Sequence, residues 1–138
     1  MKTVIILSIA MLTFLFMNAS IEKEEPTTKE ELGKLLFFDS ILSATKTISC
    51  ASCHKPEFAF ADNAPVSLGV NNRKGTRNTP SAMNLRSHET FFWDGRAATL
   101  QEQALAPIEN PAEMNLPLDI AVGRLQNNNR YKNYFKKN

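Results

Sequence analysis

The sequence predicts a small, mostly helical domain with long irregular loops. Its 138 residues correspond to one domain, and 43% hydrophobic with 22% charged residues excludes a mostly disordered chain. Apolar residues recur at helical spacing near both ends of the chain, whereas the middle is rich in proline and glycine. A formal net charge of +2 gives no argument for nucleic-acid binding. Two cysteines are too few for a disulfide scaffold or a four-cysteine zinc site.

The first twenty residues have the layout of a secretory signal peptide. Met1-Lys2 provides a positive start, Thr3 to Met17 is an almost uninterrupted apolar run, and Asn18-Ala19-Ser20 offers small residues for cleavage. An uncleaved membrane anchor is the alternative, although the run is shorter than the ~20 residues that span a bilayer. We therefore expect export to the periplasm, with membrane attachment only if residues 1–20 are retained. Residues 21–27 are predicted to be a flexible leader.

One folded domain is predicted over residues 28–138, and its first element is a helix. Two overlapping capping boxes, Thr27-x-x-Glu30 and Thr28-x-x-Glu31, mark the helix start. Three leucines at helical spacing then predict one buried face: Leu32, Leu35 and Leu36.

The middle of the chain is predicted to be loop. Residues 40–49 are polar and β-branched without a sustained period. Residues 55–81 contain five helix and strand breakers, namely Pro56, Pro65, Gly69, Gly75 and Pro80. So long a loop in a compact domain is usually functional or wrapped around a ligand.

Helices are predicted again towards the C-terminus. Thr99 is a good N-cap for a helix over residues 100–106, which Pro107 and Pro111 are expected to end. Residues 116–126 predict another helix, with Leu118, Ala121, Val122 and Leu125 on its buried face. Aromatic residues then repeat at spacings of three and four: Tyr131, Tyr134 and Phe135.

The strongest functional signal is Cys50-Ala51-Ser52-Cys53-His54, a C-x-x-C-H motif. Two thiols three positions apart can form thioethers to the two vinyl groups of one haem c, and the adjacent imidazole then ligates the iron. The alternatives are a redox-active dithiol, a plain disulfide or a zinc site. A dithiol of the thioredoxin kind needs a βαβ context that this sequence lacks, and zinc would need two further ligands.

The residue pattern alone does not decide which group, if any, is the sixth ligand of the iron. Met83, His88 and Met114 are the candidate strong ligands. Methionine ligation by Met114 would make a mono-haem electron carrier with His54 and Met114 on the iron, whereas an open position would admit peroxide. The spacing of these residues allows either function.

Several further stretches resemble the bacterial di-haem cytochrome c peroxidase family, which includes a di-haem methylamine-utilisation enzyme. The resemblance covers residue 30 to the end. The matching stretches are Leu32-Gly33-Lys34-Leu35-Leu36-Phe37-Phe38-Asp39, the C-x-x-C-H motif, Lys74-Gly75-Thr76-Arg77-Asn78-Thr79-Pro80, Phe91-Phe92-Trp93-Asp94-Gly95-Arg96-Ala97, Gln103-Ala104-Leu105-Ala106-Pro107-Ile108 and Asn110-Pro111-Ala112-Glu113-Met114.

The resemblance implies an all-α, class I cytochrome c-like domain whose loops wrap a covalently bound peroxidatic haem, with His54 as proximal ligand. It implies that Glu113 and Gln103 lie in the distal pocket and that Trp93 is an electron relay to a second haem. Asn78 would be the matching ligand of an interdomain calcium ion. The implied activity is reduction of hydrogen peroxide to water, with electrons from a c-type cytochrome or a cupredoxin. A di-haem oxidase that modifies a protein partner is a further possibility within the same family.

Two departures from the family pattern add expectations. No second C-x-x-C-H occurs in the 138 residues, so we expect a fragment or truncated product that lacks the second haem domain. Val70 stands where many members have a histidine that caps the resting iron. Because valine cannot ligate a metal, we expect a five-coordinate or water-bound iron.

General acid–base chemistry by one carboxylate gives Glu113 its expected role. It would take a proton from bound peroxide and deliver it to the leaving oxygen, with a pKa raised by burial. Gln103 would hydrogen-bond peroxide. Their ordinary interpretations are a solvated loop carboxylate and an exposed helix residue. Core packing is the ordinary interpretation of Trp93, the only tryptophan. Arg96 is expected to contact a haem propionate or an internal carboxylate.

Overall fold

The computed structural model describes residues 25–138, so the expected signal peptide lies outside the described residues. Helices dominate, and within the described part of the chain the only β-structure is three isolated bridges. The elements are α2 (Lys29–Phe38), η1 (Ser40–Leu42), α3 (Cys50–Cys53), η2 (Pro56–Phe58), η3 (Val70–Asn72), η4 (Leu85–Ser87), α4 (Leu100–Glu109), α5 (Leu118–Asn127) and α6 (Asn129–Lys137). The mostly helical fold predicted from the sequence is confirmed.

The helix α2 begins where the second capping box predicts. Thr28 is the N-cap, and its Oγ1 accepts a hydrogen bond from Glu31 N at 3.2 Å. The Glu31 carboxylate accepts from the backbone N of Thr27 at 2.7 Å, one residue earlier than in a simple capping box. Leu32 is buried as expected. The start of this helix therefore follows from hydrogen bonds among Thr27, Thr28 and Glu31.

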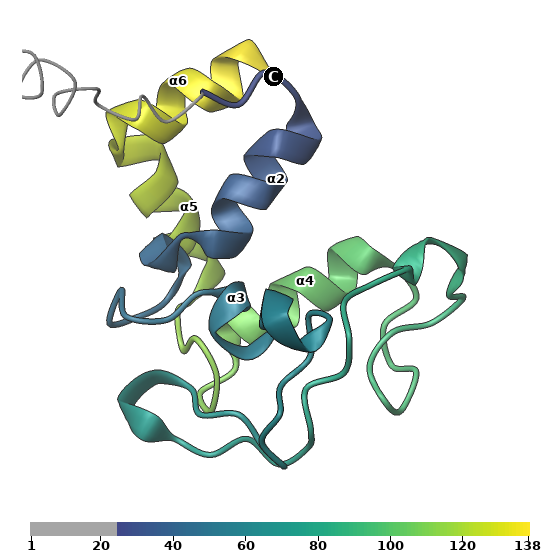
Figure 1. Ribbon diagram of the computed structural model, residues 1–138. Coiled ribbons are helices and arrows are strands. Elements are labelled where there is room, and N and C mark those ends of the chain that lie inside the picture. Colours follow the sequence, from purple (N-terminus) through teal and green to yellow (C-terminus); the bar gives the residue numbers. More distant parts are fainter. Residues whose placement is uncertain (1–24) are drawn as a thin grey trace, which may run out of the picture.

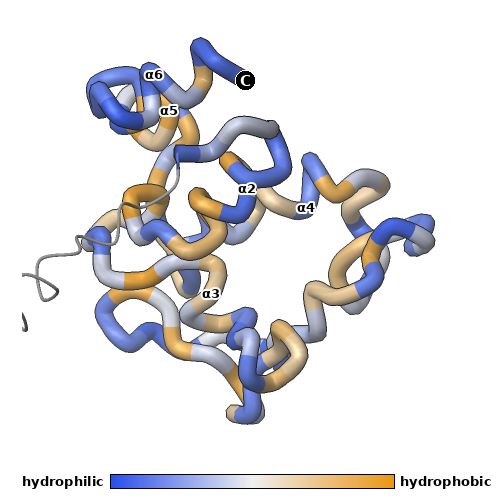
Figure 2. Tube along the Cα trace, turned by 45° about the horizontal axis from the view of Figure 1, so that its top comes forward, coloured by the Kyte–Doolittle hydropathy of each residue, from blue (hydrophilic) through white to orange (hydrophobic). Residues whose placement is uncertain are grey.

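Two clusters of buried side chains hold the helices together. Leu32 packs with Tyr131 and Tyr134 of α6, and the Tyr131 hydroxyl donates to Asp39 Oδ2 at 2.6 Å. The second cluster is built from Leu42, Met114, Leu116 and Ala121. In Figure 1, α2, α5 and α6 form one part of the molecule, and α3, α4 and the long loops form the other. Figure 2 shows that α6 is hydrophilic over most of its length, so its two tyrosines carry its attachment.

Residues 55–81 form an extended loop region, as the breakers predict. It contains only the short η2 and η3 turns and two bridges, Lys55 to Ala61 and Leu68 to Lys74. Within residues 25–138, no helix combines the length and the apolar character needed to cross a bilayer.

The predicted end of α4 at Pro107 is wrong. The helix runs on to Glu109 with Pro107 inside it, and it stops before Pro111. A proline inside a helix forfeits one backbone hydrogen bond. The last carbonyls of the helix are nevertheless satisfied by the following loop, because that of Pro107 accepts from Met114 N at 3.1 Å and that of Ile108 from Leu116 N at 2.7 Å. Hydrogen bonds from the loop after the helix thus stabilise the part of α4 that lies beyond the predicted end.

The last two helices are present, and the buried face predicted for residues 116–126 is only partly buried. Ala121 of α5 is buried, but Val122 is 51% exposed. In α6 both tyrosines are buried, whereas Phe135 is exposed. Pro26, in the described part of the expected leader, is buried, and its carbonyl accepts from Asn138 Nδ2 at 3.2 Å.

Candidate functional site

The short helix α3 carries both cysteines on one side. Ser49 precedes it as N-cap, and its backbone N donates to Ser52 Oγ at 2.9 Å, which closes a reciprocal cap around this single turn. Residues three positions apart in a helix lie on the same face, so Cys50 and Cys53 point the same way. Both thiols are free and half-buried.

Burial raises the pKa of both thiols. Reactive dithiols have the opposite property, because a low pKa supplies the thiolate that attacks a disulfide. This electrostatic environment argues against the redox-dithiol alternative and leaves the two sulfurs available for another covalent partner.

His54 is the C-cap of α3, and its ring is oriented by two backbone carbonyls. Its Nδ1 lies 3.0 Å from the carbonyl oxygen of Phe60 and 3.1 Å from that of Pro80. Since carbonyl oxygens only accept hydrogen bonds, Nδ1 carries the proton and donates it. In the neutral ring Nε2 is then the nitrogen with a free lone pair, which is the arrangement found in metal-ligating histidines.

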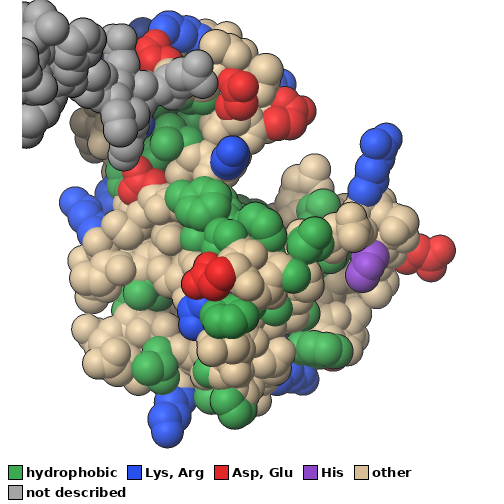
Figure 3. Space-filling view, viewed as in Figure 1, with side chains coloured by type: hydrophobic (Ala, Val, Ile, Leu, Met, Phe, Trp, Pro, Cys, Tyr) green, Lys and Arg blue, Asp and Glu red, His purple; other side chains and the backbone are tan. Residues whose placement is uncertain are grey.

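One aromatic ring, that of Phe37, lies beside the His54 ring. The Phe37 ring lies 6.1 Å from the imidazole and 6.0 Å from the Phe60 ring, between centroids. Figure 3 shows hydrophobic side chains gathered where the surface is hollowed between α2 and α4. Phe58, four residues after His54 in the sequence, is 41% exposed.

Glu113 lies on the loop after α4 and is half-buried. Asn110 Nδ2 donates to Glu113 Oε1 at 2.7 Å, and the Asn110 Oδ1 accepts from Ala112 N at 2.9 Å. Burial raises the pKa of Glu113, against the hydrogen bond from Asn110 and the charges of His54 and Arg96, which lower it. The Glu113 charge in turn contributes to the raised pKa of both cysteines. The fold thus brings this carboxylate within electrostatic range of the C-x-x-C-H motif, although 59 positions separate it from His54 in the sequence.

The segment with Val70 runs against the Glu113 loop. Val70 is fully buried, and its backbone N donates to the Glu113 carbonyl at 2.8 Å. A Cβ on Gly69 would overlap the carbonyl oxygens of Ala112 and Glu113, so only glycine allows this approach. The two loops are therefore locked together beside the candidate site.

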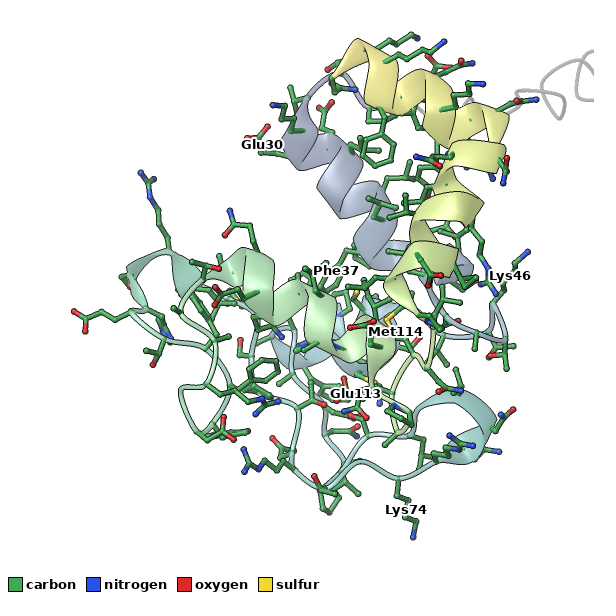
Figure 4. The ribbon with its side chains drawn as sticks, turned by 180° about the vertical axis from the view of Figure 1, so that it is seen from behind. Glu30, Phe37, Lys46, Lys74, Glu113 and Met114 are labelled. Atoms are coloured by element: carbon green, nitrogen blue, oxygen red, sulfur yellow. The ribbon has the colours of Figure 1, made fainter. Side chains whose placement is uncertain are left out.

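Met114, the sixth ligand of the electron-carrier alternative, is a core residue. Only 3% of it is exposed, and it packs with Leu42, Leu116 and Ala121 and against Cys50. In Figure 4, Phe37, Glu113 and Met114 lie in the middle of the molecule, whereas Glu30, Lys46 and Lys74 mark its periphery. His88 is exposed and stacks on Phe91 at 6.4 Å.

Two further predicted site residues, Gln103 and Trp93, differ in how far they are buried. Gln103 lies on α4 and is half-buried, so it is not the exposed helix residue of the ordinary interpretation. The core-packing interpretation of Trp93 is wrong, because its side chain is 65% exposed and its Nε1 donates to the Asn78 carbonyl at 3.0 Å. The turn that carries Trp93 is held by the buried Phe91 and Ala97, which form a backbone bridge at its base, and by charged neighbours at its tip.

Asp94 is the centre of that turn. It pairs with Arg77 and with Arg96, each at 2.8 Å, so the expected internal carboxylate partner of Arg96 is Asp94. The Asn78 side chain donates to the Ala64 carbonyl at 2.8 Å. Among residues 25–138, no three His, Cys, Asp or Glu side chains are grouped to hold a metal ion. Calcium binding at Asn78 stays a prediction.

Two parts of the site were not found from the sequence. Asn110 stands three residues before Glu113 in the quoted motif, but its hydrogen bond to the carboxylate depends on the loop conformation. The Phe60 and Pro80 carbonyls belong to no motif, since every residue has a carbonyl group. Only the fold selects the two that face His54.

A covalently bound haem c fits these residues. Cys50 and Cys53 provide two free thiols on one turn, and His54 Nε2 provides a lone pair with its partner nitrogen already hydrogen-bonded. The Phe37 ring beside the imidazole gives apolar surface of the kind that a large planar apolar group would cover.

Comparison with known proteins gives the family. A family model described as "Di-haem cytochrome c peroxidase" matches residues 27–138. The methylamine utilization protein MauG of Methylorubrum extorquens is 42% identical over 106 residues, which cover 75% of this chain and 30% of that protein. The cytochrome c551 peroxidase of Nitrosomonas europaea is 43% identical over 107 residues, which cover 78% of this chain and 32% of that protein. The chain thus spans about a third of the length of these relatives.

Solved structures agree with this assignment. A MauG-like protein associated with microbial copper homeostasis matches with a TM-score of 0.70 and 35% identity, over 80% of this chain and 34% of that one. The diheme peroxidase BthA from Burkholderia thailandensis matches with a TM-score of 0.70 and 29% identity, over 80% and 32% of the two chains. From its sequence and its fold, this chain belongs to the di-haem cytochrome c peroxidase family.

Proposed function

We propose that this chain binds one haem c through Cys50, Cys53 and His54 and forms the peroxide-reacting site of a periplasmic cytochrome c peroxidase. The observation that carries the proposal is the placement of Glu113. A half-buried carboxyl group with a raised pKa lies within electrostatic range of the C-x-x-C-H motif. Perturbed carboxyl groups at a cofactor site are typical of catalytic acids and bases.

Reduction of hydrogen peroxide to two water molecules consumes two electrons and two protons. The haem iron, when bound, supplies a Lewis-acidic site for peroxide and a store of electrons. The Glu113 carboxylate would accept a proton from one peroxide oxygen and deliver it to the other oxygen, which leaves as water. Burial raises the pKa of Glu113, which makes the carboxyl group a better proton acceptor than an exposed one.

The surroundings of Glu113 support this role. Asn110 holds one carboxylate oxygen, so the other is oriented by the same contact. Gln103, half-buried on α4, would donate a hydrogen bond to peroxide without adding charge. His54 would hold the iron through Nε2.

Electrons would come from a c-type cytochrome or a cupredoxin by way of a second haem domain. The exposed indole of Trp93 suits a relay at such a contact, because it lies at the surface while its ring nitrogen is anchored to Asn78. The electron-carrier alternative is less favoured, since Met114 is packed in the hydrophobic core against Cys50.

Substitution of Glu113 by glutamine tests the proposal. The Glu113→Gln variant keeps the size of the side chain and removes its acid–base function. We expect normal haem attachment, judged by the optical spectrum and by covalent haem staining. The spectral response to added peroxide, followed by stopped flow, should slow by about 10²–10⁴-fold.

The matched control is Glu89→Gln, which removes an exposed carboxylate. It should react with peroxide at the rate of the parent chain. A parent-like rate in Glu113→Gln would refute the acid–base role. A colourless parent chain would refute haem binding itself.

A further inference from the structure

Three separate segments meet at the Nδ1 side of His54. The ring itself belongs to the end of α3, one accepting carbonyl to Phe60 and the other to Pro80. Ala59 and Phe60 both have left-handed backbone conformations, with φ of 53° and 57°. Such conformations are unfavourable for residues other than glycine, so other contacts must hold this turn in place.

One carboxylate joins all three segments. Asp62 has a side chain that is only 4% exposed, and its Oδ1 pairs with Lys55 Nζ at 2.7 Å. The same oxygen accepts from Ala64 N at 3.2 Å, and Oδ2 accepts from Ser67 Oγ at 2.5 Å. Ser67 Oγ also lies 2.7 Å from Thr79 Oγ1.

The partners of this network are the sequence neighbours of the groups that touch His54. Lys55 follows His54, Asp62 lies two residues after Phe60, and Thr79 precedes Pro80. Asp62 N also donates to the Thr79 carbonyl at 3.4 Å. A shift of Asp62 therefore moves both accepting carbonyls relative to the imidazole ring.

We propose that Asp62 is a positioning residue for the proximal imidazole, holding the Phe60 and Pro80 carbonyls at Nδ1 through Lys55, Ser67 and Thr79. This inference rests on the proposed ligation of haem iron by His54. Asp62 touches neither the imidazole nor the site of peroxide, so it acts only through the groups that it holds.

The network has a measurable consequence at the metal. A hydrogen bond from Nδ1 to a carbonyl makes the imidazole a stronger donor and stabilises the oxidised iron. When the two carbonyls move away, Nε2 becomes a weaker donor. The reduction potential then rises, and the stretching frequency of the iron–histidine bond falls.

The first test is Asp62→Asn in the haem-loaded chain. We expect the ratio of reduced to oxidised haem at a fixed applied potential to rise about three- to tenfold, which corresponds to one weakened buried hydrogen bond. Resonance Raman spectroscopy should show a lower iron–histidine frequency. The matched control is Glu25→Gln, which removes the carboxylate of the exposed ion pair with Lys137 and should change neither readout.

A second variant separates positioning from the loss of a negative charge. Thr79→Val is nearly isosteric, changes no charge and removes the tether next to Pro80. It should shift the haem redox ratio and the iron–histidine frequency in the same direction as Asp62→Asn, by a smaller amount. If Asp62→Asn does not fold, Thr79→Val alone tests the positioning role. The proposal would be overturned if Thr79→Val had the same haem redox ratio and iron–histidine frequency as the parent chain. It would also be overturned if Asp62→Asn had the iron–histidine frequency of the parent chain. Loss of peroxide reactivity in Glu113→Gln together with parent-like Asp62→Asn would overturn this inference alone.

Discussion

Replacement of Met114 by leucine separates the two functions that the sequence left open. The thioether of Met114 would be the sixth iron ligand in an electron carrier. In the structure the side chain is 3% exposed and packs with Leu42, Leu116 and Ala121. We therefore expect Met114→Leu to behave as a core substitution and not as the loss of a metal ligand.

The size of the effect follows from the packing. Truncation of a buried methionine to alanine costs about 2–5 kcal/mol, enough to unfold a small domain and confuse the result. Leucine has nearly the same volume, and exchanges of this kind usually cost less than about 1.5 kcal/mol. The decrease in the free energy of unfolding on Met114→Leu, measured by denaturant titration, should therefore be less than about 1.5 kcal/mol.

Optical spectra of the ferric and ferrous haem provide the decisive measurement. They should be unchanged in Met114→Leu if the methionine only fills the core. The control is Met83→Leu, at the other described methionine, which is 47% exposed. Conversion of a low-spin spectrum to a high-spin one in Met114→Leu, but not in Met83→Leu, would refute this reasoning and favour the electron carrier.

Two further predictions concern Asn110 and Tyr131. Asn110→Asp keeps the oxygen that accepts from Ala112 N but replaces the donor to Glu113 with a like charge, which raises the pKa of Glu113 further. The reaction with peroxide should slow about tenfold at acidic pH, and its pH–rate profile should be displaced to higher pH. The control is Asn133→Asp at an exposed position of α6, which should leave the pH–rate profile unchanged. An undisplaced profile in Asn110→Asp would contradict the acid–base role of Glu113. Tyr131→Phe removes the hydrogen bond to Asp39 and should lower the free energy of unfolding by about 1–3 kcal/mol at neutral pH. Burial raises the pKa of Tyr131, so the parent chain loses this advantage as the unfolded tyrosine ionises above pH ~10; a constant difference across that range would contradict the buried hydroxyl.

The elements best predicted from the sequence are those with local causes. Thr28 and Glu31 mark the start of α2, because capping hydrogen bonds join residues three or four positions apart. Thr99 does the same for α4. The end of α4 could not be predicted in this way. Its last carbonyls are satisfied by Met114 and Leu116, and no local rule anticipates those partners.

The buried faces show the same limit. Helical spacing correctly predicted that Leu32 and Ala121 are buried. It also predicted Val122, which is exposed, and core packing was the ordinary interpretation of Trp93, which is more exposed still. Periodicity identifies a face, but which part of that face is covered depends on the neighbouring elements.

By itself, the sequence determined the chemistry that one turn of helix can hold. The spacing of Cys50, Cys53 and His54 is a covalent and local property, so the haem-binding motif could be recognised without a fold. Only the tertiary structure decided what surrounds that turn: the carbonyls at Nδ1, the hydrogen bond that holds Glu113 and the burial of Met114. These depend on contacts between residues far apart in the chain, and the packing of the whole domain selects them.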